Sequence, residues 1–244
     1  MRCSNTHPSV RCKAFIFTLA GVLALTSVCF AVAPSAAGPR PAAWAKQVKP
    51  SLPGLPNLYR VNASLYRSAQ PTDKGFAYLA TQPKLANGDR PIKTVLSLRA
   101  SEEDVPLVPP GSKLRIEQIR FNTWHPEDED VIKFLRILTT PELQPVLVHC
   151  QHGSDRTGMM VAIYRIAYDH WSKAQAIDEM VNGGYGFHPM WANLRHYIEK
   201  LDVDAIKKQV EEQGALKEPP IPPSGKESPQ PGPAGQAAPA DRMR

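Results

Sequence analysis

The ten residues from His149 to Gly158 constrain this chain more than any other stretch, because they combine a thiol, a guanidinium and two glycines in a short space. An apolar run, residues 145–148, precedes them, and an amphipathic run beginning at Met159 follows. This order predicts a buried strand, a tight loop and a helix. A loop that enters a helix presents backbone N–H groups and the positive end of the helix dipole to a bound anion. The stretch therefore predicts a phosphate-binding loop.

The side chains of this loop suit phosphoryl chemistry. Cys150 lies at its start, where the helix terminus and Arg156 both favour the nucleophilic thiolate. The planar guanidinium of Arg156 can bind two equatorial phosphoryl oxygens through the trigonal transition state. Gly153 lets the backbone approach these oxygens without a Cβ in the way, and Thr157 is placed to donate a hydrogen bond to the sulfur. We therefore expect Cys150 and Arg156 to be catalytic.

The loop resembles the signature of cysteine-dependent phosphatases, the protein tyrosine and dual-specificity superfamily, which reads His-Cys, five residues, Arg, then Ser or Thr. Residues 65–71, 97–99 and 124–126 extend this resemblance to the compact bacterial, fungal and plant atypical dual-specificity phosphatases. The resemblance covers nearly all of residues 58–201 and implies a phosphoric monoester hydrolase with a phosphocysteine intermediate. It also implies that the substrate phosphate is bound, with support from His149 and Thr157, by Gln151, His152, Gly153, Ser154, Asp155 and Arg156.

A leaving alkoxide or phenoxide needs a proton, so a carboxylic acid should face it. The wider superfamily implies an acid on a separate loop before a helix, where residues 124–130 offer Asp128. Myotubularin-like and some bacterial relatives imply instead an acid directly before the loop arginine, which is Asp155 here. We favour Asp155 over Asp128, whose carboxylate would also suit the first turn of a helix. His125 and His152 suit the rim of the pocket better.

Two other classes of function compete with a phosphatase. A phosphate-recognition module would keep the loop without turnover, but this chain carries a thiol, a guanidinium and a nearby acid. Thiol transfer of the rhodanese or arsenate-reductase kind would not need the Arg156-Thr157-Gly158 continuation. Within the phosphatase class, the substrate stays open between a phosphorylated protein, an inositol phosphate and a phosphoinositide. The histidines lack the spacing of metal ligands, so we expect no metal and no other cofactor.

Residues 1–33 have the pattern of a secretory signal peptide. Basic residues come first, an apolar run from Ala14 to Phe30 follows, and small residues end the segment. We expect an exported protein, periplasmic or secreted; the alternative is an uncleaved membrane anchor, although the run is short for a spanning helix. Three of the four cysteines lie in this segment. Cys150 would then be the one thiol of the mature chain, which excludes an intramolecular disulfide.

Composition divides the rest of the chain. Residues 34–57 are rich in Pro, Ala and Gly and predict a linker. Residues 215–244 have almost no large apolar side chains and predict a disordered tail, which leaves residues 58–214 as one catalytic domain. The net charge of +6 falls by three when residues 1–33 are removed, and this mild excess suits anionic substrates and not a nucleic-acid partner. A membrane partner is expected only if the N-terminal segment is retained.

Within the predicted domain, apolar runs of strand length alternate with helical patterns. Helices are predicted at residues 71–80, 131–138, 159–167, 174–181 and 191–210, the last as one or two helices. Strands are predicted at residues 58–61, 65–67, 92–98, 114–121 and 145–148. This alternation predicts an α/β fold with a mostly parallel central sheet flanked by helices, like that of dual-specificity phosphatases. The site should lie beyond the carboxyl ends of the strands.

Two features allow both a structural and a functional interpretation. Arg67 ends one predicted strand and Arg99 follows another, so both are candidates for contact with the anion, but we favour structural roles for them. Residues 183–189 combine glycines, aromatic residues and His188. They form either a lip of the pocket or a tight turn with Phe187 packed into the core, and we prefer neither.

Overall fold

The computed structural model describes residues 40–85 and 89–214. The predicted signal segment, residues 1–33, and the predicted tail, residues 215–244, lie outside the described residues. Within the described ranges, no helix is both long enough and apolar enough to cross a membrane.

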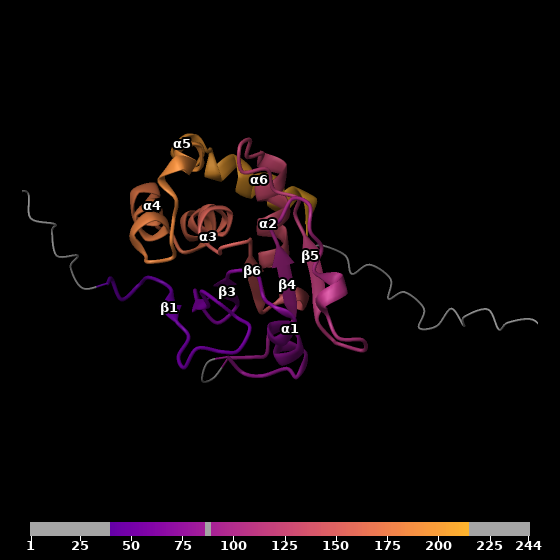
Figure 1. Ribbon diagram of the computed structural model, residues 1–244. Helices are drawn as coiled ribbons and strands as arrows, with labels where there is room; N and C mark the ends of the chain where they lie inside the picture. The colour runs from indigo at the N-terminus through magenta and orange to yellow at the C-terminus, as the bar shows by residue number, and fades with distance from the viewer. Residues whose placement is uncertain (1–39, 86–88, 215–244) are drawn as a thin grey trace, which may run out of the picture. The chain divides into compact units, whose positions relative to one another are not determined.

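A six-stranded sheet lies at the centre of the described domain (Figure 1). The strands are β1 (Lys46–Gln47), β2 (Tyr59–Arg60), β3 (Leu65–Ser68), β4 (Thr94–Ser97), β5 (Arg115–Gln118) and β6 (Val146–His149). Their order is β1-β2-β3-β6-β4-β5. β3, β6, β4 and β5 are parallel to one another, while the β1–β2 and β2–β3 pairings are antiparallel. The prediction of an α/β fold with a mostly parallel sheet is confirmed.

Helices flank this sheet: α1 (Asp73–Ala80), α2 (Asp128–Thr139), α3 (Asp155–Tyr168), α4 (Lys173–Asn182), α5 (Ala192–Lys200) and α6 (Val203–Gln213). Thr72 caps α1 by accepting the Gly75 N–H with its side chain, and Ser172 opens α4 with a capping box. The predicted helical run over residues 191–210 is two helices, because Asp202 caps a new helix, α6, directly after α5 ends.

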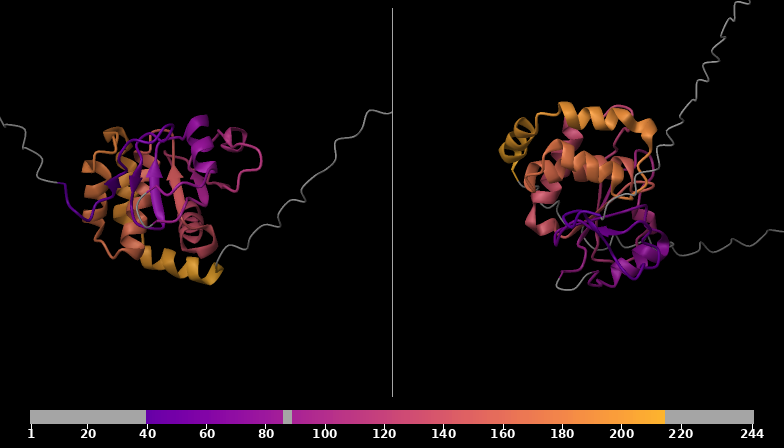
Figure 2. Two further views of the ribbon diagram at one scale, coloured as in Figure 1. Left: turned by 90° about the horizontal axis from the view of Figure 1, so that it is seen from below. Right: turned by 90° about the vertical axis from the view of Figure 1, so that its left-hand side faces the viewer.

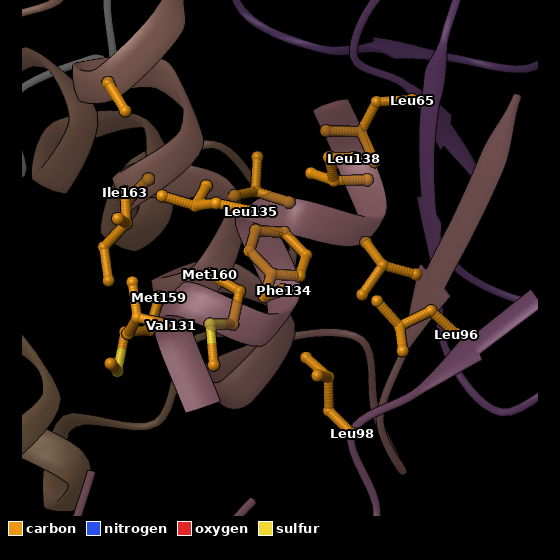
Figure 3. Packing of buried hydrophobic residues seen from close by; sticks show 14 of the residues in the cluster. Leu65, Leu96, Leu98, Val131, Phe134, Leu135, Leu138, Met159, Met160 and Ile163 are labelled. Carbon is orange, nitrogen blue, oxygen red and sulfur yellow. The ribbon is translucent and has the colours of Figure 1, made fainter. Parts of the chain in front are cut away.

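Strand residues alternate between two apolar layers, one on each face of the sheet. Leu96 and Val148 belong to the larger layer, together with side chains from α2 to α6. Figure 3 shows Phe134 of α2 and Met160 of α3 in this layer. The neighbouring residues Val95 and Leu147 belong to the other layer, which α1 covers from the opposite side (Figures 1 and 2). β4 and β6 are therefore buried on both faces, which explains the consecutive apolar residues at their centres, Val95-Leu96 and residues 146–148.

The prediction of a linker over residues 34–57 is wrong for residues 40–57, which belong to the fold. β1 pairs with β2, and Ala45 is fully buried. The Ala45 N–H donates to the Glu179 carboxylate at 2.6 Å, while Arg40 donates to the Ala45 carbonyl and to the Tyr185 hydroxyl. Proline and small residues predicted a flexible segment, but partners more than a hundred residues away hold it in place.

Candidate active site

The predicted loop lies at the carboxyl edge of the parallel strands. Ser68 of β3 and Ser97 of β4 are both in register with His149 of β6, so the three strands end at one edge. Residues 150–156, hereafter the phosphate loop, leave β6 at this edge and enter α3. The predicted strand, loop and helix are confirmed, and the site lies where the ends of parallel strands place it.

The backbone carbonyls of the phosphate loop are held from outside the loop. The donors come from residues before, within and just after β3: Asn57 Nδ2 to His152 O at 2.9 Å, Arg67 Nη2 to Gly153 O at 2.7 Å and Gln70 N to Gln151 O at 3.2 Å. The N–H groups of residues 151–156, in contrast, donate to no oxygen of the described part of the chain. A run of such N–H groups at a helix N-terminus is an anion-binding nest.

Gly153 is the point at which the loop approaches β3 most closely. Its φ is +70°, and a Cβ added there would lie 2.3 Å from the carbonyl oxygen of Ser68. A glycine was expected at this position because the backbone must approach the phosphate. The structure shows that the strand behind the loop also excludes a side chain.

Three side chains of the predicted chemistry converge on the phosphate loop. The Cys150 side chain is that of a free cysteine, and the residue is only 2% exposed. Arg156 Nη1 donates to the Leu98 carbonyl at 3.2 Å, which fixes the guanidinium at the end of β4. The Thr157 hydroxyl is buried and has no hydrogen-bond partner among the described residues. A buried hydroxyl without a partner is costly, and the expected hydrogen bond from Thr157 to the Cys150 sulfur is not formed in this structure.

A buried polar chain supports the loop from behind. His149 Nε2 lies 2.7 Å from Asp104 Oδ2, with both side chains at most 1% exposed. Gln70 donates to the other carboxylate oxygen at 2.8 Å and accepts from Arg99 at 2.8 Å. Burial alone would raise the pKa of Asp104, but its hydrogen bond and charge interaction with His149, with smaller contributions from Gln70 and Arg99, hold the pKa below its usual value. Asp104 thus orients the histidine that precedes Cys150.

Arg67 is a second support, and its preferred structural role is confirmed. It is 1% exposed, and besides its bond to Gly153 it stacks 3.6 Å from the centre of the Tyr185 ring. Burial lowers the pKa of this guanidinium, while Tyr185, Glu179 and Cys150 oppose the shift. Arg99 is structural as well, because it binds Gln70 and forms an ion pair with Glu102 at 2.9 Å.

The site opens as a pocket of about 330 Å³ above the loop. Its lining residues are Thr123, Cys150, Gln151, His152, Asp155, Arg156, His188, Met190 and Trp191. Most of the polar groups lie on the phosphate loop, Thr123 and His188 add polar groups from outside it, and Met190 and Trp191 supply an apolar wall. Met190 is 66% exposed, so this wall reaches the surface.

Asp155 has two partners in the segment between α4 and α5. Its Oδ1 accepts the backbone N–H of His188 at 2.8 Å, and its Oδ2 lies 2.9 Å from His188 Nδ1. The His188 ring also makes an edge contact with the His152 ring, at 5.6 Å between centroids. Residues 183–189 therefore contribute to the lip of the pocket through His188. Phe187 of the same segment packs against the core, as the alternative interpretation expected.

Asp128 lies elsewhere. It is the first residue of α2, is exposed, and accepts a hydrogen bond from the Tyr197 hydroxyl of α5 at 2.5 Å. Burial and this carboxylate raise the pKa of Tyr197. Asp128 lies in the first turn of α2, as the alternative interpretation expected, while Glu127 occupies the N-cap position and makes no side-chain capping hydrogen bond. Neither Asp128 nor His125 lines the pocket.

Asn57 and Asp104 are site residues to which sequence analysis assigned no role. Asn57 lay in the supposed linker, and Asp104 ends an acidic run, Glu102 to Asp104, that is typical of a solvated turn. One signal did exist, because a histidine between an apolar strand and a buried cysteine needs a polar partner. That signal does not say which residue the partner is. The described residues contain no group of three or more side chains placed to hold a metal ion.

A thiol at the base of a pocket, a loop arginine and a nest of N–H groups at a helix N-terminus define a cysteine-dependent phosphatase with a dual-specificity fold. The family model described as DSP-PTPase phosphatase fused to NAD+ kinase matches residues 56–187, more than half of the chain. The chain belongs to this family of dual-specificity-type phosphatases. Both the predicted enzyme class and the predicted fold are thereby confirmed.

Named relatives agree. The dual specificity protein phosphatase TpbA of Pseudomonas aeruginosa strain UCBPP-PA14 is 34% identical over 172 residues, which is 70% of this chain and 72% of the relative. The crystal structure of P. aeruginosa TpbA aligns with a TM-score of 0.59 at 32% identity, over 71% of this chain and 99% of that one.

A second relative bears a different name. The inositol diphosphatase SIW14 of Saccharomyces cerevisiae is 27% identical over 156 residues, which is 62% of this chain and 53% of the relative. The crystal structure of its core catalytic domain aligns with a TM-score of 0.56 at 24% identity, over 67% of this chain and 96% of that one. This structural likeness shows the shared fold.

Proposed function

We propose that the chain is an exported phosphomonoester hydrolase that acts on phosphorylated protein side chains through a phosphocysteine intermediate. The observation that carries this proposal is the phosphate loop itself. Its carbonyls are held from outside and its N–H groups are unpaired within the described chain. Cys150 and Arg156 line the pocket above these N–H groups. A bound phosphoryl group therefore meets a nucleophile at one end of the loop and a guanidinium at the other.

The mechanism follows from these positions. The Cys150 thiolate attacks phosphorus as the bond to the leaving oxygen breaks, and water then attacks phosphorus and releases the thiolate. Arg156 and the loop N–H groups bind the equatorial oxygens in both transition states. The unpaired Thr157 hydroxyl can stabilise the departing sulfur. Asp155 lines the pocket and Asp128 does not, which supports the preference for the Asp155 side of the pocket, and not the Asp128 side, as the source of the leaving-group proton.

The pocket wall supports a protein side chain as the substrate. Met190 and Trp191 offer apolar surface for the body of a phosphorylated residue, and an aromatic ring can pack against them. TpbA is named a dual specificity phosphatase, and its structure has been determined in complex with phosphotyrosine. Among the described lining residues, Arg156 is the one arginine or lysine. The alternative substrate, an inositol polyphosphate, carries several phosphates, and this pocket lining offers them only one arginine or lysine side chain.

A hydrolysis panel tests the substrate class. Phosphotyrosine, phosphoserine and phosphothreonine peptides should turn over faster, by kcat/KM, than inositol phosphates, inositol diphosphates and phosphoinositides. Cys150→Ser should abolish turnover while keeping affinity for inorganic phosphate, because the hydroxyl is a poor nucleophile but the nest of N–H groups is unchanged. Substantial turnover by Cys150→Ser would refute the phosphocysteine mechanism, and preference for an inositol phosphate would refute the protein substrate.

Export is tested separately. The basic and apolar pattern of residues 1–33 supports cleavage and release from the cytoplasm. The mature protein recovered from its host should begin near Pro34 or Gly38 and be found in the periplasmic or secreted fraction. Intact Met1 in the membrane fraction would contradict cleavage and favour an uncleaved anchor.

A further inference from the structure

We propose that His188 is a catalytic residue of this site: its Nε2 gives the proton to the leaving-group oxygen, and Asp155 acts by holding the ring. This inference rests on the phosphatase mechanism proposed above. Its starting point is the pair of contacts between the two residues, one through the His188 backbone N–H and one through ring Nδ1, at 2.8 and 2.9 Å. Together they fix both the position and the orientation of the imidazole.

These contacts leave Asp155 poorly placed to donate directly. Oδ1 accepts the backbone N–H, and Oδ2 faces the ring nitrogen. A proton on Oδ2 would point at Nδ1 and not at a substrate. The carboxylate is also buried, with its side chain only 9% exposed, whereas the His188 side chain is 48% exposed and lines the pocket. The imidazole is therefore the accessible end of the pair.

The free nitrogen of His188 can carry both proton transfers. Nε2 makes no hydrogen bond to any residue in the described part of the chain. With Nδ1–H donating to the carboxylate, the imidazolium carries a second proton on Nε2, and the neutral ring has a lone pair there. A carboxylate that holds Nδ1 in this way sets the tautomer in which Nε2 exchanges protons.

The steps balance. In the first, the bond between Cys150 Sγ and phosphorus forms, the bond between phosphorus and the leaving oxygen breaks, and the Nε2 proton moves to that oxygen. In the second, a water oxygen attacks phosphorus and its proton returns to Nε2, while the bond between sulfur and phosphorus breaks and the electron pair stays on the thiolate. The titratable and charged groups that share the pocket with His188 are Asp155, His152, Cys150 and Arg156.

The deciding variant is His188→Asn. The amide nitrogen of Asn occupies nearly the place of Nδ1 and can still donate to Asp155 Oδ2, and the backbone N–H bond is untouched, but the variant has no titratable group at Nε2. We expect kcat on an alkyl phosphate to fall by about 10²- to 10⁴-fold. An aryl phosphate whose phenol is acidic needs no proton and should lose only a few-fold.

Controls separate this proposal from folding and from the wider mechanism. His196→Gln removes an exposed imidazole on α5 that does not line the pocket, and should not change the dependence of the rate on the leaving group. Asp155→Asn, and the double variant Asp155→Asn with His188→Asn, should lose about as much rate on the alkyl phosphate as His188→Asn alone. The effects of substituting residues that act as one unit do not add. Inorganic phosphate binding and the melting temperature show whether each variant is folded. If His188→Asn fails to fold, His188→Gln takes its place.

Two outcomes would overturn the assignment. If His188→Asn keeps wild-type rates on both esters, the proton comes from another group. If it loses the same factor on both, His188 only positions other residues. In either case a burst of phenol from the aryl phosphate, with Cys150→Ser inactive, would leave the phosphocysteine mechanism intact, so the two proposals fail independently.

Discussion

Gly153→Ala should impair catalysis far more than it impairs stability. The residue has a φ of +70°, and a left-handed conformation costs an L-residue about 1–2 kcal/mol. In addition, the new Cβ would lie 2.3 Å from the Ser68 carbonyl oxygen, a separation that must grow to at least 3.0 Å. The obstacle is backbone of β3, which cannot rotate away. The phosphate loop must therefore move by about 0.7 Å.

A shift of this size acts on the reacting geometry. A misplacement of about 1 Å can cost about 10²-fold in rate. The Gly153 carbonyl is also the acceptor of the buried Arg67 guanidinium, so the same movement weakens a support of the loop. We expect kcat/KM on an aryl phosphate to fall by about 10²-fold, with weaker binding of inorganic phosphate.

Gly111→Ala is the matched control. Gly111 has a similar φ of +76°, but nothing lies within 4 Å of its added Cβ. It should show the backbone strain alone, a loss of about 2–8 °C in melting temperature, with unchanged kcat/KM. If Gly153→Ala matched Gly111→Ala in kcat/KM, the close approach to β3 would not set the geometry of the loop, and the reasoning would be refuted.

Two further variants test the charged groups of the site. Arg156→Lys should lower kcat by about 10²- to 10³-fold, because a point charge replaces a bidentate fork. Arg195→Lys, at an exposed position of α5, is the control and should leave kcat unchanged. Equal rates in the two variants would show that Arg156 is structural. Asp104→Asn should lower the free energy of unfolding at pH 7 by about 1–3 kcal/mol. Because the pKa of Asp104 is held below its usual value, its contribution is complete above the unfolded pKa of about 3.9 and is lost as pH falls through the folded value. Denaturant titrations should therefore show the two proteins converging toward acid pH, and a constant difference would contradict the assignment.

Local sequence was sufficient to predict the part of the site that is contiguous in the chain. An apolar strand, a glycine-containing loop and a helix follow one another between residues 145 and 168, and each is determined by residues within a few positions. Caps at Thr72 and Ser172 are equally local. Cys150 and Arg156 converge because the loop between them is short.

A structural role was predicted for Arg67, but the sequence does not show which residues hold the loop in place. The donors to its carbonyls lie about 80 to 95 positions earlier, at Asn57, Arg67 and Gln70. Asp104 reaches His149 across 45 positions. Composition gave a wrong prediction for residues 40–57. This segment is proline-rich like a linker, although it contributes backbone and Asn57 to the fold. Tertiary pairing, and not local propensity, decides these contacts.

Asp128 and Asp155, the two carboxylates considered as general acids, also could not be told apart from local sequence. Asp128 and Asp155 both begin helices, α2 and α3, so local sequence gives them the same favourable first-turn position. They differ in what packs against them from the C-terminal half of the chain. Asp128 meets the Tyr197 phenol, whose pKa its charge helps to raise, whereas Asp155 meets an imidazole that lines the pocket. A phenol in that state holds its proton, whereas an imidazole held through Nδ1 still has a second ring nitrogen that can give or accept a proton. It is therefore the partner, more than the carboxylate, that makes one helix terminus suitable for proton transfer.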